Sequence, residues 1–290
     1  MTHTPQVADR LTADQAAAAR RLADDARAAD GTAALDEQTL LRLDPGSARS
    51  ATHVLLPDDD GSGLAGYAQL AEGSAELVVA PSARRDGRGR ALLGAVKEAD
   101  PAAAVWAHGD LPAARALAAS ASLTRTRELL RMGTALAAAT RPEPPAGVRI
   151  ETFDPAAHAE AWVRLNAAAF ASHPEQGSMT LADLRERENQ TWFDPSLLLL
   201  AFDDGADAPV GFIWMKPGET ASEAELYVLG IDPSAQGRGL GRLLTGVGLA
   251  EVAERGRTEI DLYVEGDNAP ALATYRRAGF DVVERHAQYS

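Results

Sequence analysis

A glycine-rich, basic turn near the C-terminus has the composition of a phosphate-binding loop. It reads QGRGLGR from Gln236 to Arg242 and runs directly into an apolar stretch typical of a helix. Its glycines leave no side chain between ligand and backbone, so consecutive N–H groups can converge on phosphate oxygens at the positive end of the helix. The spacing matches neither a Walker loop, which needs Gly-Lys-Ser/Thr, nor the G-x-G-x-x-G dinucleotide fingerprint. We expect a pyrophosphate site here; a turn that binds nothing is the alternative.

The same turn occurs a second time in the first half of the chain. The segment VAPSARRDGRGRAL can be placed on IDPSAQGRGLGRLL so that these pairs coincide: Pro81 and Pro233, Ser82 and Ser234, Gly87 and Gly239, Gly89 and Gly241. Each copy follows an apolar run that starts at a glutamate, Glu76 or Glu225, and precedes an Ala/Leu-rich helical stretch. A strand, turn and helix repeated in the same order indicate internal duplication. The sequence therefore predicts two tandem α/β domains.

Length and proline content agree with this division. A chain of 290 residues is long enough for two domains of about 150 residues, each with its own core. The segment TRPEPPAG, residues 140–147, contains three prolines, which remove backbone donors and disfavour helix. We expect an N-terminal domain over residues 1–139, a linker over 140–147 and a C-terminal domain over 148–290.

Composition narrows the possible partners. The formal charge is −14 and the acidic residues are scattered, which argues against nucleic acid. No apolar stretch reaches the roughly 18 residues of a membrane span, and the N-terminus lacks a secretory pattern, so we expect a cytosolic protein. We also expect a monomer. The chain has no cysteine, which excludes disulfides, thiolate nucleophiles and Cys-based metal sites. The six histidines are not spaced as metal ligands, and no metal is expected.

Hydrophobic periodicity predicts the elements that must position the loops. In the first half we expect helices over 13–29, 90–99 and 112–119, the first of them capped by Thr12. Strands are expected over 53–56, 66–70, 75–79 and 103–107. In the second half we expect helices over 156–168, 239–255 and 269–278, and strands over 197–202, 210–215, 225–231, 259–264 and 280–284. Both halves then form mixed, mostly antiparallel sheets flanked by helices.

A second segment follows the last long strand expected before the C-terminal helix. It reads EGDNAPALATYRRAGF, in which Asn268 can cap the helix and Pro270 fits its first turn. Tyr275 lies about two helical turns beyond Asn268, on nearly the same face. Together with the glycine loop, this segment resembles the GNAT N-acetyltransferases. The resemblance implies that this face borders the thioester of acetyl-CoA and that Tyr275 protonates the departing thiolate; a core aromatic residue is the alternative.

The reaction that the resemblance implies needs a base. An α-amine has a pKa near 8 and attacks a thioester only when neutral, so a carboxylate acting through water would assist it. Glu225 starts the strand that leads to the loop, and the period of two puts its side chain on the same face as Tyr227. Strand-end N–H groups at residues 229–231 would polarise the thioester carbonyl. We expect Glu225 to be the base; an exposed strand start is the alternative.

Almost the whole chain is similar to the mycothiol synthases of actinobacteria, a family of tandem GNAT enzymes. HPEQG, WFDP, GFIWMK and ELYVLGIDPSAQGRGLG carry the likeness. It implies acetylation of the cysteinyl amine of desacetylmycothiol, the last step of mycothiol biosynthesis, with these substrate contacts: Glu37, Glu175, Lys216, Glu225 and Tyr263. It implies these contacts to the reactive acetyl-CoA: Leu229, Gly230, Ile231, Gln236, Gly237, Arg238, Gly239, Leu240, Gly241, Arg242, Asn268, Ala269, Pro270, Ala271, Leu272 and Ala273. A second, unreactive acetyl-CoA would be held by Leu77, Val78, Val79, Arg85, Asp86, Gly87, Arg88, Gly89 and Arg90.

The first half departs from the pattern at one point. Aligning Pro112 with Pro270, or Leu123 with Phe280, places Leu117 or Ala118 opposite Tyr275, so that no phenol is available there. The N-terminal domain is therefore expected to be non-catalytic. Two other functions remain open: a GNAT enzyme for a different amine, such as an aminoglycoside or a protein N-terminus, and a non-catalytic acetyl-CoA sensor.

Overall fold

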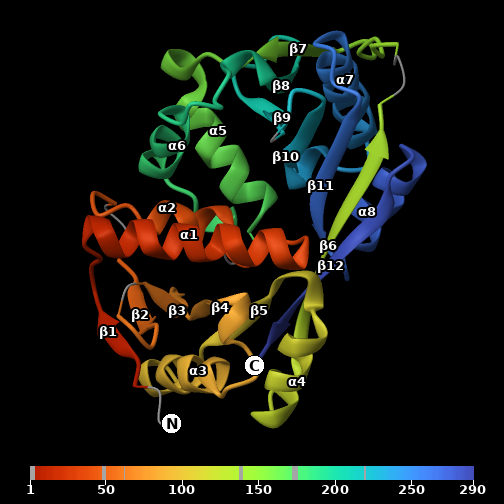
Figure 1. The fold of residues 1–290 in the computed structure, drawn as a ribbon. Helices are drawn as coiled ribbons and strands as arrows, with labels where there is room; N and C mark the ends of the chain where they lie inside the picture. Colours follow the sequence, from red (N-terminus) through yellow and green to blue (C-terminus); the bar gives the residue numbers. More distant parts are fainter. Residues whose placement is uncertain (1–3, 48–49, 62, 137–139, 172–175, 219) are drawn as a thin grey trace. The chain divides into compact units, whose positions relative to one another are not determined.

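The computed structural model describes residues 4–47, 50–61, 63–136, 140–171, 176–218 and 220–290. It divides into two compact units, unit 1 (residues 1–130 and 284–290) and unit 2 (residues 131–283). Each unit is a mixed sheet covered by helices (Figure 1), which is the fold class that the sequence predicts. The boundary between the units falls inside a strand, Arg125–Ala135, and the proline-rich segment 140–147 lies within unit 2.

Unit 1 is built on strands in the order β1-β2-β3-β4-β5-β12. Its elements are β1 (Gln6–Ala8), α1 (Ala13–Asp30), α2 (Glu37–Arg42), β2 (Thr52–Pro57), β3 (Leu64–Ala71), β4 (Ser74–Val79), η1 (Pro81–Ala83), α3 (Arg88–Ala99), β5 (Ala104–Ala107), η2 (His108–Asp110), α4 (Pro112–Ser120) and the start of β6 (Arg125–Ala135). Strands β4 and β5 run parallel, and the end of β12 pairs antiparallel with β5. This crossover places α3 between two parallel neighbours, as a strand–helix–strand unit requires.

The helices of unit 1 cover both faces of its sheet. Helix α1 is capped by Thr12, as the sequence predicts, and Thr12 forms a capping box with Gln15. Its apolar side packs on one face, where Tyr67 is fully buried. Helix α3 packs on the other face, where Leu92 is fully buried among residues of β2, β3 and β5. Each sheet face thus buries its alternate residues against a helix.

Unit 2 repeats the plan with strands in the order β6-β11-β10-β9-β8-β7. Its elements are the end of β6, β7 (Val148–Thr152), α5 (Pro155–Ala169), η3 (Gln176–Ser178), α6 (Leu181–Glu188), η4 (Pro195–Leu197), β8 (Leu198–Asp203), β9 (Pro209–Pro217), β10 (Glu223–Ile231), η5 (Pro233–Ala235), α7 (Leu240–Glu254), β11 (Glu259–Glu265), α8 (Ala269–Arg277) and the start of β12 (Asp281–Tyr289), which continues into unit 1. Strands β10 and β11 are parallel, like β4 and β5 in unit 1. The two units therefore share the strand–turn–helix–strand order that indicated duplication.

The core of unit 2 is aromatic on one side of the sheet. Helices α5 and α6 cover that face, where Trp162 and Trp214 are fully buried with ring centroids 5.5 Å apart. Helix α7 covers the other face at Gly248. A Cβ there would lie 2.8 Å from both Ile213 Cδ1 and Met215 Sδ, so glycine is needed for this close approach.

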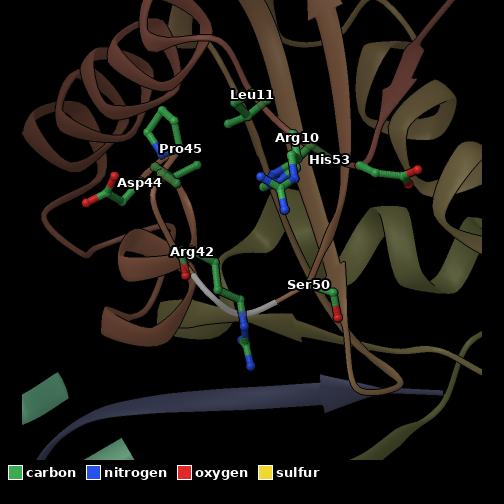
Figure 2. A pocket seen from close by; sticks show the side chains of 10 residues that line it. Arg10, Leu11, Arg42, Asp44, Pro45, Ser50 and His53 are labelled. Carbon is green, nitrogen blue, oxygen red and sulfur yellow. The ribbon is translucent and has the colours of Figure 1, made fainter. Parts of the chain in front are cut away.

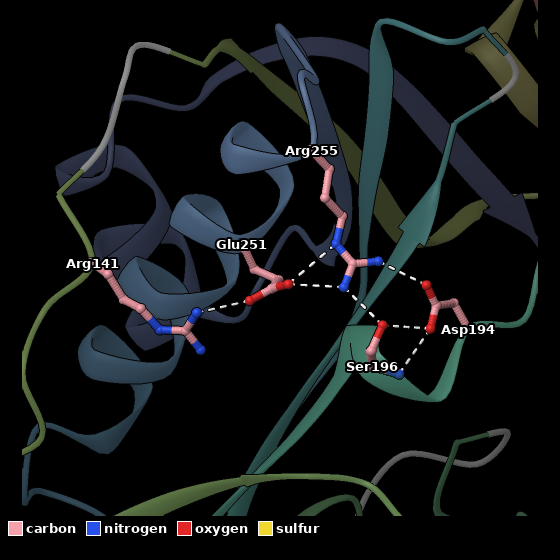
Figure 3. A network of polar contacts seen from close by, with 5 residues as sticks. All are labelled: Arg141, Asp194, Ser196, Glu251 and Arg255. Atoms are coloured by element: carbon pink, nitrogen blue, oxygen red, sulfur yellow. Dashed lines mark hydrogen bonds and ion pairs between the residues drawn. The ribbon is translucent and has the colours of Figure 1, made fainter.

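Ion pairs fix the C-terminal half of α7 (Figure 3). Glu251 accepts from Arg141, which precedes the prolines of the expected linker, at 2.8 Å, and from Arg255. Arg255 also contacts Asp194 Oδ2 and Ser196 Oγ, each at 2.7 Å. The C-terminal end of α7 is thus tied to two other segments of unit 2.

Several elements are absent from the sequence-based prediction. Helices α2 and α6 are short, and the sequence of α6, LADLRERE, is dominated by charge. Strand β6 carries four charged residues and fully buries only Leu130 and Met132, so its alternation is weak. Strands β1 and β7 are also outside the prediction, because three or five residues carry little periodic signal. No helix in the described part of the chain is long and apolar enough to cross a membrane.

Candidate active site

The glycine turn of unit 2 has the geometry of an anion-binding loop. Gly237 and Gly239 have φ of 77° and 81°, the left-handed conformation that glycine adopts without strain. A Cβ on Gly237, Gly239 or Gly241 would meet no atom within 4 Å, so the approach to this backbone is open. Gly239 precedes α7 without a side-chain cap. The first N–H groups of α7 are thus left for another partner at the positive end of the helix dipole.

Arginines surround this turn. Arg238 makes a bidentate contact with Asp203 at the end of β8, at 2.5 and 3.1 Å, and this hydrogen bonding lowers the pKa of the Asp203 carboxyl. Arg242 is exposed on the first turn of α7. The charge around the loop suits a diphosphate, and the Asp203 contact holds one guanidinium beside the glycines.

Unit 1 keeps the same loop conformation with a different sequence. Gly87 has φ of 80° and precedes α3 as Gly239 precedes α7. Arg85 stands where unit 2 has Gly237 and adopts φ of 66°, although this conformation costs a residue with a Cβ roughly 1–2 kcal/mol. The Arg88 guanidinium is buried and bonded to Asp59 and Asp86. Arg88 thus fixes the loop from within, while the backbone keeps the shape of an anion site.

The pairing between the two parallel strands of unit 2, β10 and β11, ends in front of the loop. Their paired residues run from Glu223 and Glu259 to Leu226 and Leu262, whereas β10 continues to Ile231. A bulge at Tyr227 interrupts the pairing of β10 with β9 at the same point. Within the described residues, 229–231 therefore lie beyond the β11 ladder, and their N–H groups on that side can serve a ligand.

In unit 1 the two parallel strands also separate in front of the loop, and we call the point of separation in each unit the fork. The register of β4 with β5 ends at Glu76 and Trp106, and residues 77–79 continue beyond it. Leu117 of α4 lies next to the loop: a Cβ on Gly89 would be 3.4 Å from its Cδ2. An apolar side chain thus lies beside the loop of unit 1.

Glu225 and Lys216 lie directly opposite each other on β10 and β9. Opposite residues share a face of the sheet, and the ammonium of Lys216 lies 4.5 and 5.1 Å from the rings of Trp192 and Tyr227. Glu225 and Tyr227 are therefore on one face, as alternation predicts. On β11 the neighbour of Glu225 is Asp261, whose carboxylate is engaged by Arg131. This pairing lowers the negative charge beside Glu225.

Tyr275 lies on α8 as the sequence predicts. Asn268 caps this helix by accepting from the N–H of Ala271, and Pro270 is in its first turn. Tyr275 is buried, and loss of solvent raises the pKa of its phenol to about 12. The phenol therefore stays protonated at neutral pH and can donate a proton.

The remaining expected residues are distributed over both units. Glu37 is the first residue of α2 in unit 1, whereas Tyr263 is on β11 of unit 2 and is 47% exposed. Glu175 lies outside the described residues. Its neighbour Gln176 exchanges hydrogen bonds with the buried Asn166 of α5, at 2.7 and 2.9 Å.

The two glutamates that begin the apolar runs, Glu76 and Glu225, do not occupy equivalent positions. Val79 of β4 pairs with Gly66 of β3, and Ile231 of β10 pairs with Gly211 of β9. In both units the residue that follows donates its backbone N–H to the partner strand, β3 or β9. Counting back along β4 and β10 from these pairs shows that Glu76 is equivalent to Val228 and not to Glu225. The signal was present in the sequence, since Glu76 is nearer to Pro81 than Glu225 is to Pro233, and the bulge at Tyr227 accounts for part of that difference.

Glu76 belongs to a buried polar cluster that the sequence did not reveal. Its carboxylate lies 2.7 Å from His108 Nε2 and accepts from the N–H of Asp36 at 2.8 Å. Burial opposes charge on His108, but the carboxylates of Glu76, Asp36 and Glu284 together outweigh it and raise the pKa of the ring. Among the described residues no group of three or more His, Asp or Glu side chains has metal-binding geometry.

A separate pocket of about 200 Å³ lies in unit 1 (Figure 2). Its lining contains none of the expected site residues and consists of Asp9, Arg10, Leu11, Arg42, Leu43, Asp44, Pro45, Ser47, Ser50 and His53. His53 Nδ1 lies 2.7 Å from the hydroxyl of Tyr67, and burial lowers the pKa of this ring. The pocket is thus distinct from the loops and forks.

Comparison with known proteins agrees with this geometry. The model of the acetyltransferase (GNAT) family matches residues 161–280. The chain is 48% identical to a mycothiol acetyltransferase of Beutenbergia cavernae, covering 92% of this chain and 93% of that protein. It is 47% identical to one of Geodermatophilus obscurus, covering 96% and 94%. Among solved structures, a tandem GNAT protein from the clavulanic acid biosynthesis pathway is similar in fold, with a TM-score of 0.73 and 19% identity over 98% of this chain and 97% of that one.

Proposed function

The chain belongs to the mycothiol acetyltransferases, and on this basis we propose that unit 2 transfers the acetyl group of acetyl-CoA to the cysteinyl amine of desacetylmycothiol. The observation that carries the proposal is the combination of an open glycine loop before α7 with a strand, β10, that leaves the β11 ladder after Leu226. The first feature suits a diphosphate and the second suits an extended acyl-bearing arm. Both stand on the same strand–turn–helix segment.

The loop and its flanking backbone fit acetyl-CoA by their donor set. The amides from Gln236 to Arg242 would hold the diphosphate at the positive end of α7, with Arg238 and Arg242 adding charge. The N–H groups of residues 229–231 would donate to the thioester carbonyl and stabilise the charge that develops on its oxygen. Residues 268–273, in the cap and first turns of α8, would border the reacting end.

Glu225 and Tyr275 would move the protons. Glu225, acting through water, would accept a proton from the substrate amine, because the amine must be neutral to attack. The Tyr275 phenol, which burial keeps protonated, would donate a hydrogen bond to the sulfur of acetyl-CoA and pass it a proton as the C–S bond breaks, so that CoA leaves as the free thiol. Lys216, Glu225 and Tyr263 of unit 2 would contact the substrate, and the contacts expected of Glu37 and Glu175 stay predictions.

Unit 1 would bind a second acetyl-CoA without turning it over. Its loop keeps the left-handed residues Arg85 and Gly87, and residues 77–79 extend beyond the β5 register. Leu117, which has no proton to donate, lies beside this loop. A ligand bound there would lack the acid that unit 2 supplies.

We further propose that the protein is a monomer, which light scattering would test.

The deciding experiment measures release of free CoA from acetyl-CoA with a panel of amines. The panel contains desacetylmycothiol, an aminoglycoside and a peptide with a free N-terminus. We expect release with desacetylmycothiol and only background with the others. Release with the aminoglycoside or peptide instead would favour a GNAT enzyme for another amine. Coenzyme binding without release for any amine would favour a sensor.

A further inference from the structure

Trp192, in the WFDP segment between α6 and η4, has no role in the reaction as proposed above. We propose that Trp192 is a positioning residue for the acceptor substrate: with Tyr227 it holds the ammonium of Lys216 on the sheet face that carries Glu225. The inference rests on the proposed function, in which Lys216 contacts the substrate. Trp192 would act through Lys216.

The ammonium of Lys216 meets two aromatic rings. Its Nζ lies 4.5 Å from the centroid of Trp192 and 5.1 Å from that of Tyr227, both within the range of a cation–π interaction. The two rings are 5.4 Å apart with planes at 64°. A lysine has a flexible four-carbon stem, and two rings of different orientation restrict its end far more than one would.

The rings themselves are held by the core. Trp192 and Tyr227 both pack against Trp214, which is fully buried, at 5.9 and 5.3 Å. The hydroxyl of Tyr227 accepts from Nε of Arg187 at 3.0 Å, and Arg187 is itself buried on α6. The clamp is therefore anchored to the aromatic core of unit 2.

Backbone geometry puts this clamp beside the expected base. Tyr227 is the bulged residue of β10, and Lys216 lies opposite Glu225 across the β9–β10 pair. The bulge keeps Tyr227 and the following Val228 on the α5 side, where both contact the core. A change in the position of the Lys216 ammonium would thus alter the surroundings of an acceptor amine without touching the coenzyme loop.

The test compares Trp192→Leu with Trp192→Phe in steady-state assays. We expect Trp192→Leu to raise KM for desacetylmycothiol roughly 5- to 30-fold, as loss of a partly desolvated cation–π contact implies, with kcat and KM for acetyl-CoA nearly unchanged. Trp192→Phe keeps a ring and should have a smaller effect. Phe193→Leu is the matched control, because Phe193 packs on the same Trp214 at 5.8 Å but is not one of the two rings over Lys216. Its KM should stay near that of the unsubstituted protein.

A double-substitution cycle separates positioning from a general effect on the fold. If Trp192 acts through Lys216, Trp192→Leu should raise KM no further in a Lys216→Met background. The side-chain methylene protons of Lys216, shifted by ring currents in the unsubstituted protein, should move toward ordinary values in the NMR spectrum of Trp192→Leu. Additive effects of the two substitutions, or an unchanged lysine spectrum, would overturn the inference. Failure of the proposed function would look different, since the unsubstituted protein would then release no CoA with desacetylmycothiol.

Discussion

Glu76 of β4 and His108, which directly follows β5, form a buried pair at the point where the two strands of unit 1 lose their register. In unit 2 the corresponding fork follows Leu226, and the base expected there, Glu225, occupies a different strand position. The two copies thus keep the same loop and fork but place different polar groups beside them. Unit 1 uses its carboxylate to bind other protein groups.

This pair makes the stability of unit 1 dependent on pH. Because the pKa of His108 is raised in the folded state, the stabilisation is complete below the unfolded value of about 6.5 and is lost as pH rises through the folded value. We expect the urea midpoint to fall as pH increases across that window. His108→Gln should flatten the dependence, and a midpoint that falls equally in this variant would contradict the assignment.

Replacement of Tyr275 by phenylalanine tests the acid. The substitution removes the hydroxyl and keeps the buried ring that packs on Phe280. We expect kcat to fall about 100-fold, within the range for general acid catalysis, while acetyl-CoA affinity changes little. Calorimetry with acetyl-CoA and single-turnover rates provide the two measurements. An unchanged kcat would remove Tyr275 from the mechanism.

The Tyr275 pKa also shapes the pH profile. Because burial raises the pKa of this phenol to about 12, it should stay protonated over the range in which rates can be measured. We expect no decline of kcat near pH 10, where an ordinary tyrosine titrates. A decline there that is absent in Tyr275→Phe would show that the phenol titrates normally.

Glu225 has a matched control on its own strand. Glu223 lies two residues earlier on β10, and its carboxylate accepts from the N–H of Thr220, a role that glutamine can also fill. We expect Glu225→Gln to lower kcat/KM at neutral pH by about 100-fold, and Glu223→Gln to leave it nearly unchanged. Equal losses in both variants would indicate a general effect of charge on this strand.

The two loops allow a similar comparison. Gly239 and Gly87 have φ of 81° and 80°, and both face open space, so a side chain strains each position to a similar degree. Gly239→Glu should abolish turnover by placing a carboxylate where the diphosphate is expected. Gly87→Glu should spare turnover and remove one coenzyme site in calorimetry. Loss of turnover in Gly87→Glu, with intact circular dichroism, would make the first loop part of catalysis.

The main elements could be predicted from the sequence because their signals are local. The capping box at Thr12, the cap at Asn268 and the glycine turns depend on neighbouring residues, and the structure has each of them. The same holds for the fold class, since the alternation of strands and helices repeats in each half. The two-domain boundary at residues 140–147 and the roles of the site residues stay predictions.

Other features were decided by tertiary structure, because they depend on pairing between distant segments. The bulge at Tyr227 exists only in the register of β10 with β9, and it adds one residue to β10 between Glu225 and the loop. The Glu76–His108 pair and the clamp of Trp192 and Tyr227 on Lys216 join residues far apart in the chain. Local composition encodes the backbone conformation of the glycine turns, whereas the pairing of distant strands decides which polar side chains lie beside them.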